Sequence, residues 1–523
     1  MLEGLTLRTI YPKKEHDELI VKFDQLQTRL VTLWQHIGRS DPGSQQIEHA
    51  NTVLVIPSLT VELKFDIASQ QAYEERMLFM LFLLQQPNIR LIYLSSLPVA
   101  ESIINYYLDV MPRVSVSNAR KRLYMLSPGD ASDLPLIRKI LDRKKLIEHI
   151  RSMVPDPDKA HIVPFLTTDL ERDLSVQLGI PMYAADPQYV AFGTKTGCRE
   201  IFSEEGVPHP LGAQDLHSLE DLVRAVSEIR KQKPGLSRMI VKQNNGVSGY
   251  GNAALDLEGL DAAGGKQEKL FIQERLRTMK FEMESLTYDS YISDFEKYGG
   301  IVEELVAGDE ILSPSAQLRI TPLGEVQQLS THDQMLGGPT GQTFLGARFP
   351  ANAEYGAHIM AEAMKIGRRL AREGIVGRFA VDFIIVRTGT GGWEPFAIEI
   401  NLRKGGTTHP FLTLQYLTDG TYDSEQCVFR TKHGREKYYI ATDNVKSPDY
   451  KVFTPEDLFD IISQSRLHFD HTTQTGIVLH MISSVSTHGR LGFTAIGDSH
   501  VHAQEIYQEF VDILGRAANS YRD

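Results

Sequence analysis

The sequence predicts a multidomain protein of mixed α/β and α+β class, with an open α/β layer at its N-terminal end. Its 523 residues are too many for one core and correspond to roughly three domains of about 100–200 residues each. Strand and helix patterns alternate over residues 1–185, as in a parallel α/β layer. Further along, residues 375–410 contain two apolar runs around a Gly-rich turn, which indicates a β-hairpin.

The composition is that of an ordinary globular protein, with 42% hydrophobic and 23% charged residues. The formal net charge of −12 argues against a nucleic-acid binder, because such proteins neutralise phosphates with a surplus of Lys and Arg. The two cysteines, Cys198 and Cys427, lie far apart in the sequence. This usage indicates no disulfide framework and fits a reducing compartment.

Targeting and membrane signals are not expected. The start of the chain lacks the basic-then-apolar order of a secretory signal. The most apolar run, Met77 to Leu84, has eight residues, whereas a membrane-spanning helix needs roughly 20. We therefore expect a cytoplasmic protein without a membrane partner, and we expect this run to be part of a buried helix.

The N-terminal layer is predicted from short apolar strands that alternate with amphipathic helices. No G-x-G-x-x-G motif opens a helix here, so dinucleotide binding is not supported, and a scaffold domain that contributes to a substrate cleft is the simpler interpretation. The predicted helices are His16–Ile37, Ala72–Leu84, Val99–Val110 and Pro135–Met153, and the predicted strands are Thr52–Pro57, Arg90–Leu94, Leu123–Leu126, His161–Phe165 and Pro181–Ala184.

The hairpin carries polar groups inside apolar strands. Asp382 lies in the first strand, and Glu399 and Asn401 lie in the second, where side chains two residues apart share a face. Two carboxylates and an amide are oxygen ligands that suit Mg²⁺. A solvated sheet face is the alternative, because half-exposed hairpins often carry acids. Arg403 and Lys404 directly afterwards favour a phosphate site.

Two lysines precede the hairpin. Lys195 begins a helix that ends near Glu204, and Lys242 ends a strand that leads into a glycine-containing loop. Glycines let backbone N–H groups approach anionic oxygens, and a lysine supplies a point charge. Alone, Lys195 would be read as a surface lysine, whereas for the loop a flexible hairpin turn is the alternative to a phosphate-binding loop. The loop residues of interest are Gly246, Ser248, Gly249 and Gly251.

The segment from Gly300 to Glu310 is predicted to be a strand that enters a turn, and it carries Glu303 and, seven residues later, Glu310. In isolation a solvated edge strand is the better interpretation. A hairpin of Ala316–Ile320 and Val326–Leu329 follows, and then a long amphipathic helix, Ala351–Arg372.

The C-terminal residues predict two paired strands and a closing helix. Thr454 and Pro455 form a capped helix start, strands follow at 476–482 and 492–497, and the closing helix covers about 503–514. Four histidines lie here, but their spacing fits no zinc signature. For His409 or His488 we consider a substrate-facing role. The four are His480, His488, His500 and His502.

Taken in order, these elements resemble the ATP-grasp superfamily over roughly residues 190–420. The motifs are Lys195-Thr-Gly-Cys-Arg, Gly246-Val-Ser-Gly-Tyr-Gly and Glu399-Ile-Asn-Leu-Arg-Lys-Gly-Gly, and they look like those of the pheganomycin-type peptide ligases. That resemblance implies a pre-ATP-grasp α/β domain, a two-lobed ATP-grasp fold and a small C-terminal α+β lid. The expected domains are 1–185, 186–420 (lobes of about 186–300 and 301–420) and 421–523.

The resemblance also implies roles for single residues. ATP would be held at its phosphates by Lys195, Lys242 and the glycine loop. Glu303 and the backbone from Glu304 to Val306 would contact the adenine, and Glu310 would contact the ribose. The Mg²⁺ ligands would be Asp382, Glu399 and Asn401. Arg403, with Arg319 second, would stabilise the transferring phosphate.

The implied activity is that of an ATP- and Mg²⁺-dependent carboxylate–amine ligase that works through an acyl phosphate. Its expected partners are small-molecule carboxylate and amine substrates, such as amino acids or peptides, and no nucleic acid. A phosphotransferase and a nucleotide-binding regulatory protein are the alternatives. A homodimer is the commonest soluble assembly, and the sequence gives no further indication of the oligomeric state.

Overall fold

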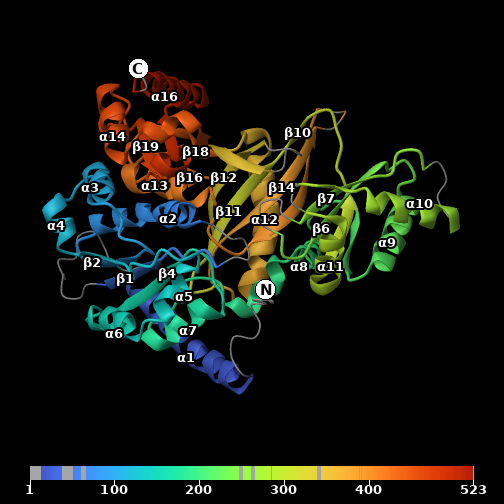
Figure 1. Ribbon diagram of the computed structural model, residues 1–523, viewed down its shortest axis with the longest axis horizontal. Coiled ribbons are helices and arrows are strands. Elements are labelled where there is room, and N and C mark those ends of the chain that lie inside the picture. Colours follow the sequence, from blue (N-terminus) through green and yellow to red (C-terminus); the bar gives the residue numbers. More distant parts are fainter. Residues whose placement is uncertain are drawn as a thin grey trace.

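The computed structural model describes residues 13–37, 51–60, 66–246, 251–260, 266–283, 286–337, 343–387, 389 and 391–521. Figure 1 shows three regions: a layered N-terminal region with the first helices, a central region of long strands, and a lobe built from β6, β7 and the helices α9 to α11. The C-terminal helix α16 (His500–Ser520) lies at the edge of the central region, far from that lobe.

The N-terminal layer is a parallel sheet, as predicted, and its four strands lie in the order β3–β2–β1–β4. Alternate residues of its strands enter two different cores: Val53 and Leu91 pack on one face, and Leu54 and Ile92 on the other. Its strands are β1 (Asn51–Ile56), β2 (Ile89–Leu94), β3 (Leu123–Leu126) and β4 (Ala160–Pro164), and its helices include α1 (Lys13–Ile37), α2 (Ile67–Glu75), α3 (Glu101–Val110), α4 (Val116–Arg120) and α7 (Asp169–Leu178).

Three predicted elements of this layer are wrong in detail. The helix expected at 72–84 is α2, ending at Glu75, followed by the 3₁₀ helix η1 (Leu78–Gln85), whose apolar run is buried on nearly all sides. The helix expected at 135–153 is divided into α5 (Leu136–Leu141) and α6 (Lys144–Ser152). Residues 181–184 form no strand: Met182 makes one isolated bridge to Ile162, and Pro181 has no N–H to extend a ladder.

The lobe on the right of Figure 1 contains an antiparallel five-stranded sheet in the order β5–β9–β6–β7–β8. Helices α9 (Leu219–Gln232), α10 (Lys266–Arg277) and α11 (Tyr288–Tyr298) supply apolar residues to its core, among them Val226, Ile272 and Phe295. The strands are β5 (Gly212–Leu216), β6 (Arg238–Gln243), β7 (Asn252–Asp256), β8 (Lys280–Phe281) and β9 (Gly300–Glu304).

A nine-stranded antiparallel sheet forms the centre of the molecule, in the order β10–β14–β11–β12–β13–β18–β20–β19, with β15 paired to β14. The predicted hairpin is confirmed as β14 (Gly377–Arg387) and β15 (Trp393–Asn401). Helix α12 (Ala353–Arg372) packs on this sheet through residues such as Ile359 and Ile366. The remaining strands of this part are β10 (Ile311–Leu312), β11 (Pro314–Ile320), β12 (Val326–Gly337) and β13 (Thr343–Phe349).

The C-terminal residues add strands to the same sheet. β18 (Tyr438–Lys446) pairs with β13 and β20 (Arg490–Gly497), and β20 pairs with β19 (Gly476–His480). Helix α16 covers β18 and β20 and also meets α14 (Pro455–Gln464). The predicted order of strand, strand and helix is confirmed, and continuous hydrogen bonding joins this unit to the central sheet.

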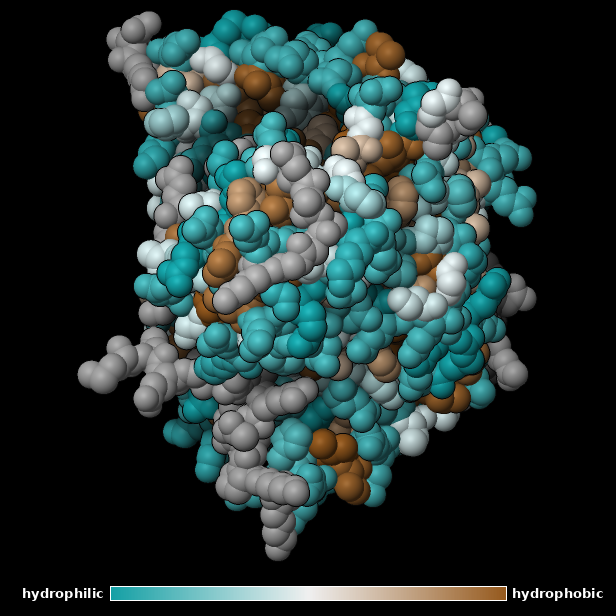
Figure 2. Space-filling view, turned by 90° about the vertical axis from the view of Figure 1, so that its right-hand side faces the viewer, coloured by the Kyte–Doolittle hydropathy of each residue, from teal (hydrophilic) through white to brown (hydrophobic). Residues whose placement is uncertain are grey.

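The face of the molecule drawn in Figure 2 is mostly polar. On the face shown in Figure 2, hydrophobic residues form small separate groups within a hydrophilic surface. Within the described ranges, no helix combines the length and apolarity needed to cross a membrane. Cys198 and Cys427 are both buried and free, as expected from the absence of a disulfide framework.

Candidate nucleotide and metal site

Asp382 and Glu399 are directly opposite each other on β14 and β15, because Asp382 pairs in register with Glu399. Asn401 donates from Nδ2 to Asp382 Oδ2 at 2.8 Å, and Gln334 of β12 donates from Nε2 to Oδ1 at 2.9 Å. Burial and the nearby Glu399 raise the pKa of Asp382 to about 7. Two facing carboxylates beside an amide oxygen fit a magnesium ion, whose charge would replace the proton of Asp382.

Lys195 neutralises the second carboxylate. It is the first residue of α8 (Lys195–Glu204), which Thr194 caps by accepting from Gly197 N. Its Nζ lies 2.8 Å from Glu399 Oε1. Burial alone would raise the pKa of Glu399, but the charge and hydrogen bond of Lys195, together with the charges of Arg403 and Lys242, lower it below its usual value. A buried lysine and a carboxylate on one side of a prospective metal site are arranged to bind phosphate and metal together.

Arg403 belongs to the same group, since its Nη1 donates to Asn401 Oδ1. It follows β15 directly, where the chain turns toward helix α13 (Thr408–Thr418). The structure thus brings together five of the predicted residues, which are Lys195, Asp382, Glu399, Asn401 and Arg403. Sequence reasoning missed Gln334, because nothing in the 12-residue strand β12 distinguishes it from the other polar residues there.

A second ionic group lies in the smaller lobe. Lys242 Nζ is 2.5 Å from Glu303 Oε1, and Arg199 Nη1 is 3.0 Å from Oε2. Burial would raise the pKa of Glu303, yet Lys242 and Arg199 lower it. Arg199 was not assigned a role from the sequence, although it lies four residues after Lys195 and so on the same face of α8.

The glycine loop can be placed only in part. Gly246 N donates to Gln243 O at 3.3 Å, and Gly251, with φ of +86°, accepts from Gln243 N at 3.0 Å. These contacts close the turn between β6 and β7. Ser248 and Gly249 lie outside the described residues.

Within the predicted base-contacting segment, Glu304 to Val306, one backbone donor is available. Glu304 N donates to Leu211 O at 2.8 Å and Leu305 N donates to Arg238 O at 3.2 Å. The Glu304 carboxylate accepts from Leu211 N and pairs with Lys233. Among the described residues, the Val306 N–H has no hydrogen-bond partner, so it is the N–H of this segment that could contact a base.

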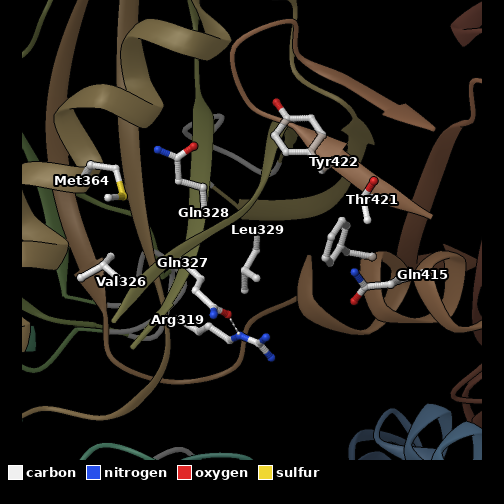
Figure 3. Close-up of a pocket in the computed structure, with 10 residues that line it drawn as sticks. Arg319, Val326, Gln327, Gln328, Leu329, Met364, Gln415, Thr421 and Tyr422 are labelled. Carbon is white, nitrogen blue, oxygen red and sulfur yellow. Dashed lines mark hydrogen bonds between the residues drawn. The ribbon is translucent and has the colours of Figure 1, made fainter. Parts of the chain in front are cut away.

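Two predicted residues lie apart from these groups. Glu310 is exposed and pairs with Arg387 at 2.6 Å. Arg319 pairs in register with Arg378, whereas Ser315 is the register partner of Asp382, so Arg319 lies about 13 Å along the strand from the carboxylates. Arg319 donates to Gln327 and lines a cavity of about 480 Å³ between the sheet and α13 (Figure 3).

Arg319 belongs to a group of cations that includes Arg378 and Lys404. Burial and the charge of Arg319 lower the pKa of Arg378 to about 10, and burial and Arg378 lower that of Lys404 to about 7. Arg378 Nη1 is buried without a hydrogen-bond partner, and Lys404 Nζ donates to Pro164 O. None of the three forms an ion pair with a described carboxylate. Like charges on directly opposed strand residues destabilise a sheet unless an anion compensates them.

The histidines noted near the C-terminus lie in different places. His480 is buried against His409, with their Nε2 atoms 3.0 Å apart. His488 pairs with Asp66 at 2.9 Å near the surface, His500 packs on the ring of Tyr438, and His502 lies 3.8 Å from Asp498. His409 and His488 therefore have protein partners, and their expected substrate-facing role stays a prediction.

Comparison with known families matches residues 188–287 and 272–425 to the model described as "IQCH-like, ATP-grasp", and residues 457–510 to the model described as "PGM1 C-terminal domain". The ATP-grasp resemblance expected from the motifs is confirmed.

Two curated proteins are similar to the chain. An L-propargylglycine–L-glutamate ligase of Streptantibioticus cattleyicolor is 28% identical over 433 residues, which are 81% of this chain and 86% of that protein. IQ motif-containing protein H of Danio rerio is 22% identical over 399 residues, and the match covers 68% of this chain and 37% of that protein.

Among solved structures, the ADP complex of purK, an N5-carboxyaminoimidazole ribonucleotide synthetase, aligns over 90% of this chain and 98% of its own. The TM-score is 0.50 and the sequence identity 12%. This likeness concerns the fold and supports the predicted fold class.

Proposed function

We propose that this chain, which carries an ATP-grasp domain over residues 188–425, is an ATP- and Mg²⁺-dependent carboxylate–amine ligase that forms an amide or peptide bond. One observation carries the proposal: a lysine of α8 meets polar residues of the hairpin β14–β15 and of the turn after it, far away in the sequence. These residues are Lys195, Asp382, Glu399, Asn401 and Arg403. A related protein named as a ligase of two amino acids supports amino acid or peptide substrates.

Nucleotide binding would use both ionic groups. Lys195 and Lys242 would leave Glu399 and Glu303 and bind phosphate oxygens, while Arg199 keeps Glu303 ionised. The Val306 N–H and the Glu304 carbonyl would contact the base, and Glu310 would contact the ribose. Gly246, Ser248, Gly249 and Gly251 would close over the phosphates.

Mg²⁺, held by Asp382, Glu399 and Asn401, would neutralise phosphate charge in the reaction. In the first step a substrate carboxylate oxygen bonds to the γ-phosphorus and the bond to the ADP oxygen breaks, giving an acyl phosphate and ADP. In the second step an amine bonds to the acyl carbon, the tetrahedral intermediate expels phosphate, and the amine proton passes to solvent or phosphate. Arg403, which donates to Asn401 Oδ1, would hold the transferring phosphate and the oxyanion.

Arg319 has a different role in this proposal from the one expected for it. Together with Arg378 and Lys404 it would hold an anionic group of the substrate at a distance from the reacting carboxylate. The uncompensated charges of the three residues support this assignment. Such a substrate carries a second acidic group, as an acidic amino acid or a peptide with an acidic side chain does.

Hydroxylamine trapping tests the ligase proposal. Purified protein, ATP and Mg²⁺ are incubated with hydroxylamine and a pool of amino acids, small acids and peptides, and hydroxamates are identified by mass. A hydroxamate that is lost in Glu399→Gln and kept in Glu394→Gln, an exposed acid on the same strand, supports the acyl phosphate. ADP without any hydroxamate favours a phosphotransferase, and ATP binding without turnover favours a regulatory nucleotide-binding protein.

A further inference from the structure

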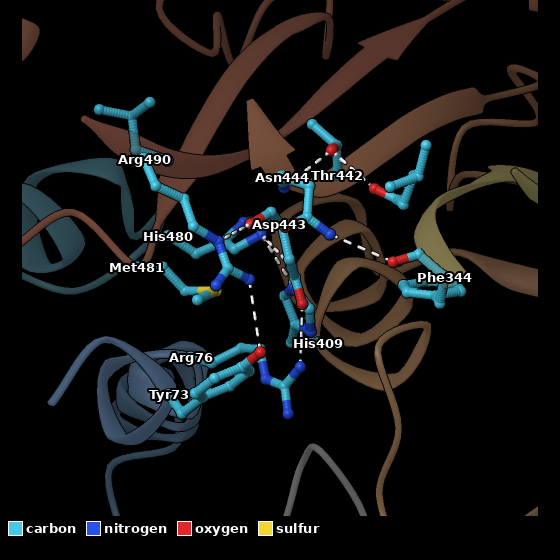
Figure 4. Close-up of polar contacts among 12 residues, drawn as sticks. Tyr73, Arg76, Phe344, His409, Thr442, Asp443, Asn444, His480, Met481 and Arg490 are labelled. Atoms are coloured by element: carbon cyan, nitrogen blue, oxygen red, sulfur yellow. Dashed lines mark hydrogen bonds and ion pairs between the residues drawn. The ribbon is translucent and has the colours of Figure 1, made fainter. Parts of the chain in front are cut away.

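Three buried side chains outside the nucleotide site meet at a single point. They are His409 at the start of α13, Asp443 in β18 and His480 at the end of β19. Figure 4 shows the two imidazole rings and the carboxylate turned toward one another. His480 Nε2 lies 2.7 Å from Asp443 Oδ1, His409 Nε2 lies 3.3 Å from the same oxygen, and the two Nε2 atoms are 3.0 Å apart.

Protons alone cannot satisfy this triangle of atoms. Each Nε2 carries either a proton or a lone pair, and the ionised carboxylate has only lone pairs. With one proton, one contact joins two lone pairs. With two protons, two N–H groups face each other at 3.0 Å. A cation at the centre would attract all three atoms at once.

The charge states of the three side chains agree with a cation at the centre of the triangle. Burial lowers the pKa of His409 to about 3, so its ring is neutral at pH 7 and has one nitrogen free to act as a ligand. Burial would raise the pKa of Asp443, but His409, His480 and Arg76 hold it well below its usual range, so the carboxylate is ionised. Metals bind neutral imidazole and ionised carboxylate.

The spacing of the triangle is that of metal ligands. Zinc binds imidazole nitrogen at about 2.0–2.1 Å and carboxylate oxygen at about 2.0–2.2 Å, so two of its ligands lie about 2.9–3.4 Å apart for bond angles between 90° and 110°. The three measured separations lie within or close to this range. Only small movements would be needed to accept an ion.

The surroundings of Asp443 fix its orientation. Arg76 donates from Nη1 to Asp443 Oδ2 at 2.9 Å, which leaves Oδ1 directed at the histidines. Arg490 donates from Nε to the backbone carbonyl of Asp443 at 2.8 Å. Arg76 is itself held between the rings of Tyr73 and Phe165, at 4.9 Å from each ring centroid. A held carboxylate of this kind is typical of metal sites.

We propose that His409, Asp443 and His480 form a binding site for a first-row divalent transition metal such as Zn²⁺, with solvent completing its coordination. Imidazole ligands favour such metals over Mg²⁺, so this site would be selective against the ion of the nucleotide site. The ion would join α13, the C-terminal strands and, through Arg76, the N-terminal layer. Because His409 is a proposed ligand, the ion would also fix one end of the segment from Arg403 to His409.

Metal binding to the full-length protein tests this inference. The wild-type chain, stripped with a chelator and dialysed, is titrated with Co²⁺ and Zn²⁺ by absorption spectroscopy and calorimetry. We expect one equivalent of Zn²⁺ per chain, and visible Co²⁺ bands that Zn²⁺ abolishes. Wild-type protein that binds neither ion overturns the proposal, and this result does not depend on any variant.

Variants then assign the ligands. Asp443→Asn and His480→Ala should weaken Zn²⁺ binding by more than about 100-fold, since even partners that only orient a ligand contribute 10- to 100-fold. The control is His488→Ala, which removes a histidine that pairs with a carboxylate near the surface and should leave Zn²⁺ binding unchanged. Equal Zn²⁺ affinity in wild type and both ligand variants contradicts the proposal. Because the readout is metal binding alone, it is separate from the test of ligase activity.

Discussion

The two ends of the segment from Arg403 to His409 lead to two clusters that handle charge differently. At the Arg403 end, Glu399 is already paired with Lys195, and Asp382 is only partly ionised near neutral pH because its pKa is about 7. At the His409 end, an ionised Asp443 faces two imidazoles that cannot all be satisfied by protons. In the proposed function, the residues of the first cluster would give up their ion pairs with one another to bind Mg²⁺ and phosphate. In the second cluster, two imidazole nitrogens and a carboxylate oxygen already point toward one position.

Loss of a carboxylate should have its largest effect at the first cluster. Glu399→Gln removes a proposed Mg²⁺ ligand and leaves Lys195 buried without its partner. We expect Mg²⁺-dependent ADP release, measured with the substrate pool, to fall by at least about 10³-fold. Glu394→Gln on the same strand should keep wild-type turnover. A Glu399→Gln enzyme with near-normal turnover would remove this carboxylate from the mechanism.

The two arginines should differ in which kinetic constant they affect. Arg403→Ala removes a charge beside Asn401 and should lower kcat by about 10²–10³-fold. Arg319→Ala removes one of the cations near the cavity of Figure 3 and should mainly raise KM for the carboxylate substrate, with kcat changed less than about tenfold. Steady-state kinetics with varied carboxylate concentration measures kcat and KM separately for the two variants. If Arg319→Ala instead lowered kcat and Arg403→Ala mainly raised KM, Arg319 would be the residue that contacts the transferring phosphate.

The contrast between the clusters also explains what the sequence could predict. The hairpin around Asp382 and Glu399 follows from apolar alternation and a Gly-rich turn, and its two strands are close in the chain. Lys195 could be included only through the order of several motifs. The hairpin and the parallel N-terminal layer, which follow from local patterns, are confirmed, whereas the roles of Lys195 and the other site residues stay predictions.

The second cluster could not be found in this way. Asp443 and His480 are 37 residues apart, and His409 is 71 residues from His480, so no short spacing connects them. They meet because β18, β20 and β19 extend the central sheet beside α13. Arg319 shows the same limit, since the strand alone does not reveal that its register partner is Arg378 rather than Asp382.

Ligand-induced stabilisation should separate the two clusters. A ligand at 100 times its Kd adds about 2.7 kcal/mol to the free energy of unfolding. We expect Mg²⁺ with ADP, and Zn²⁺ without nucleotide, each to raise Tm in the wild type. His480→Ala should lose the rise in Tm with Zn²⁺ and keep the rise with Mg²⁺ and ADP. Lys195→Ala should lose most of the rise with Mg²⁺ and ADP and keep the rise with Zn²⁺. Loss of both effects in either variant would mean that the clusters do not act independently.

The smallest expected effect concerns a buried carboxylate that has neither lysine nor imidazole beside it. Glu171 accepts hydrogen bonds from Thr60 and Thr168, and burial raises its pKa to about 7. Between the unfolded pKa near 4.5 and about 7 the folded chain binds one proton more than the unfolded chain. The stability contributed by this group is therefore complete at low pH and lost as the pH rises through 7.

Glu171→Gln, which cannot ionise, should thus gain stability relative to wild type as the pH rises. Between pH 5 and pH 8 the expected gain is about 2.5 kcal/mol, measured by urea unfolding. The exposed Glu148→Gln should show no such change, and Glu74 and Glu75, whose pKa values are also about 7, affect both proteins equally. A pH-independent difference would mean that Glu171 is ionised in the folded chain. Two hydroxyl groups and one backbone N–H would then be enough to hold a buried charge, whereas the two clusters use cations or imidazoles.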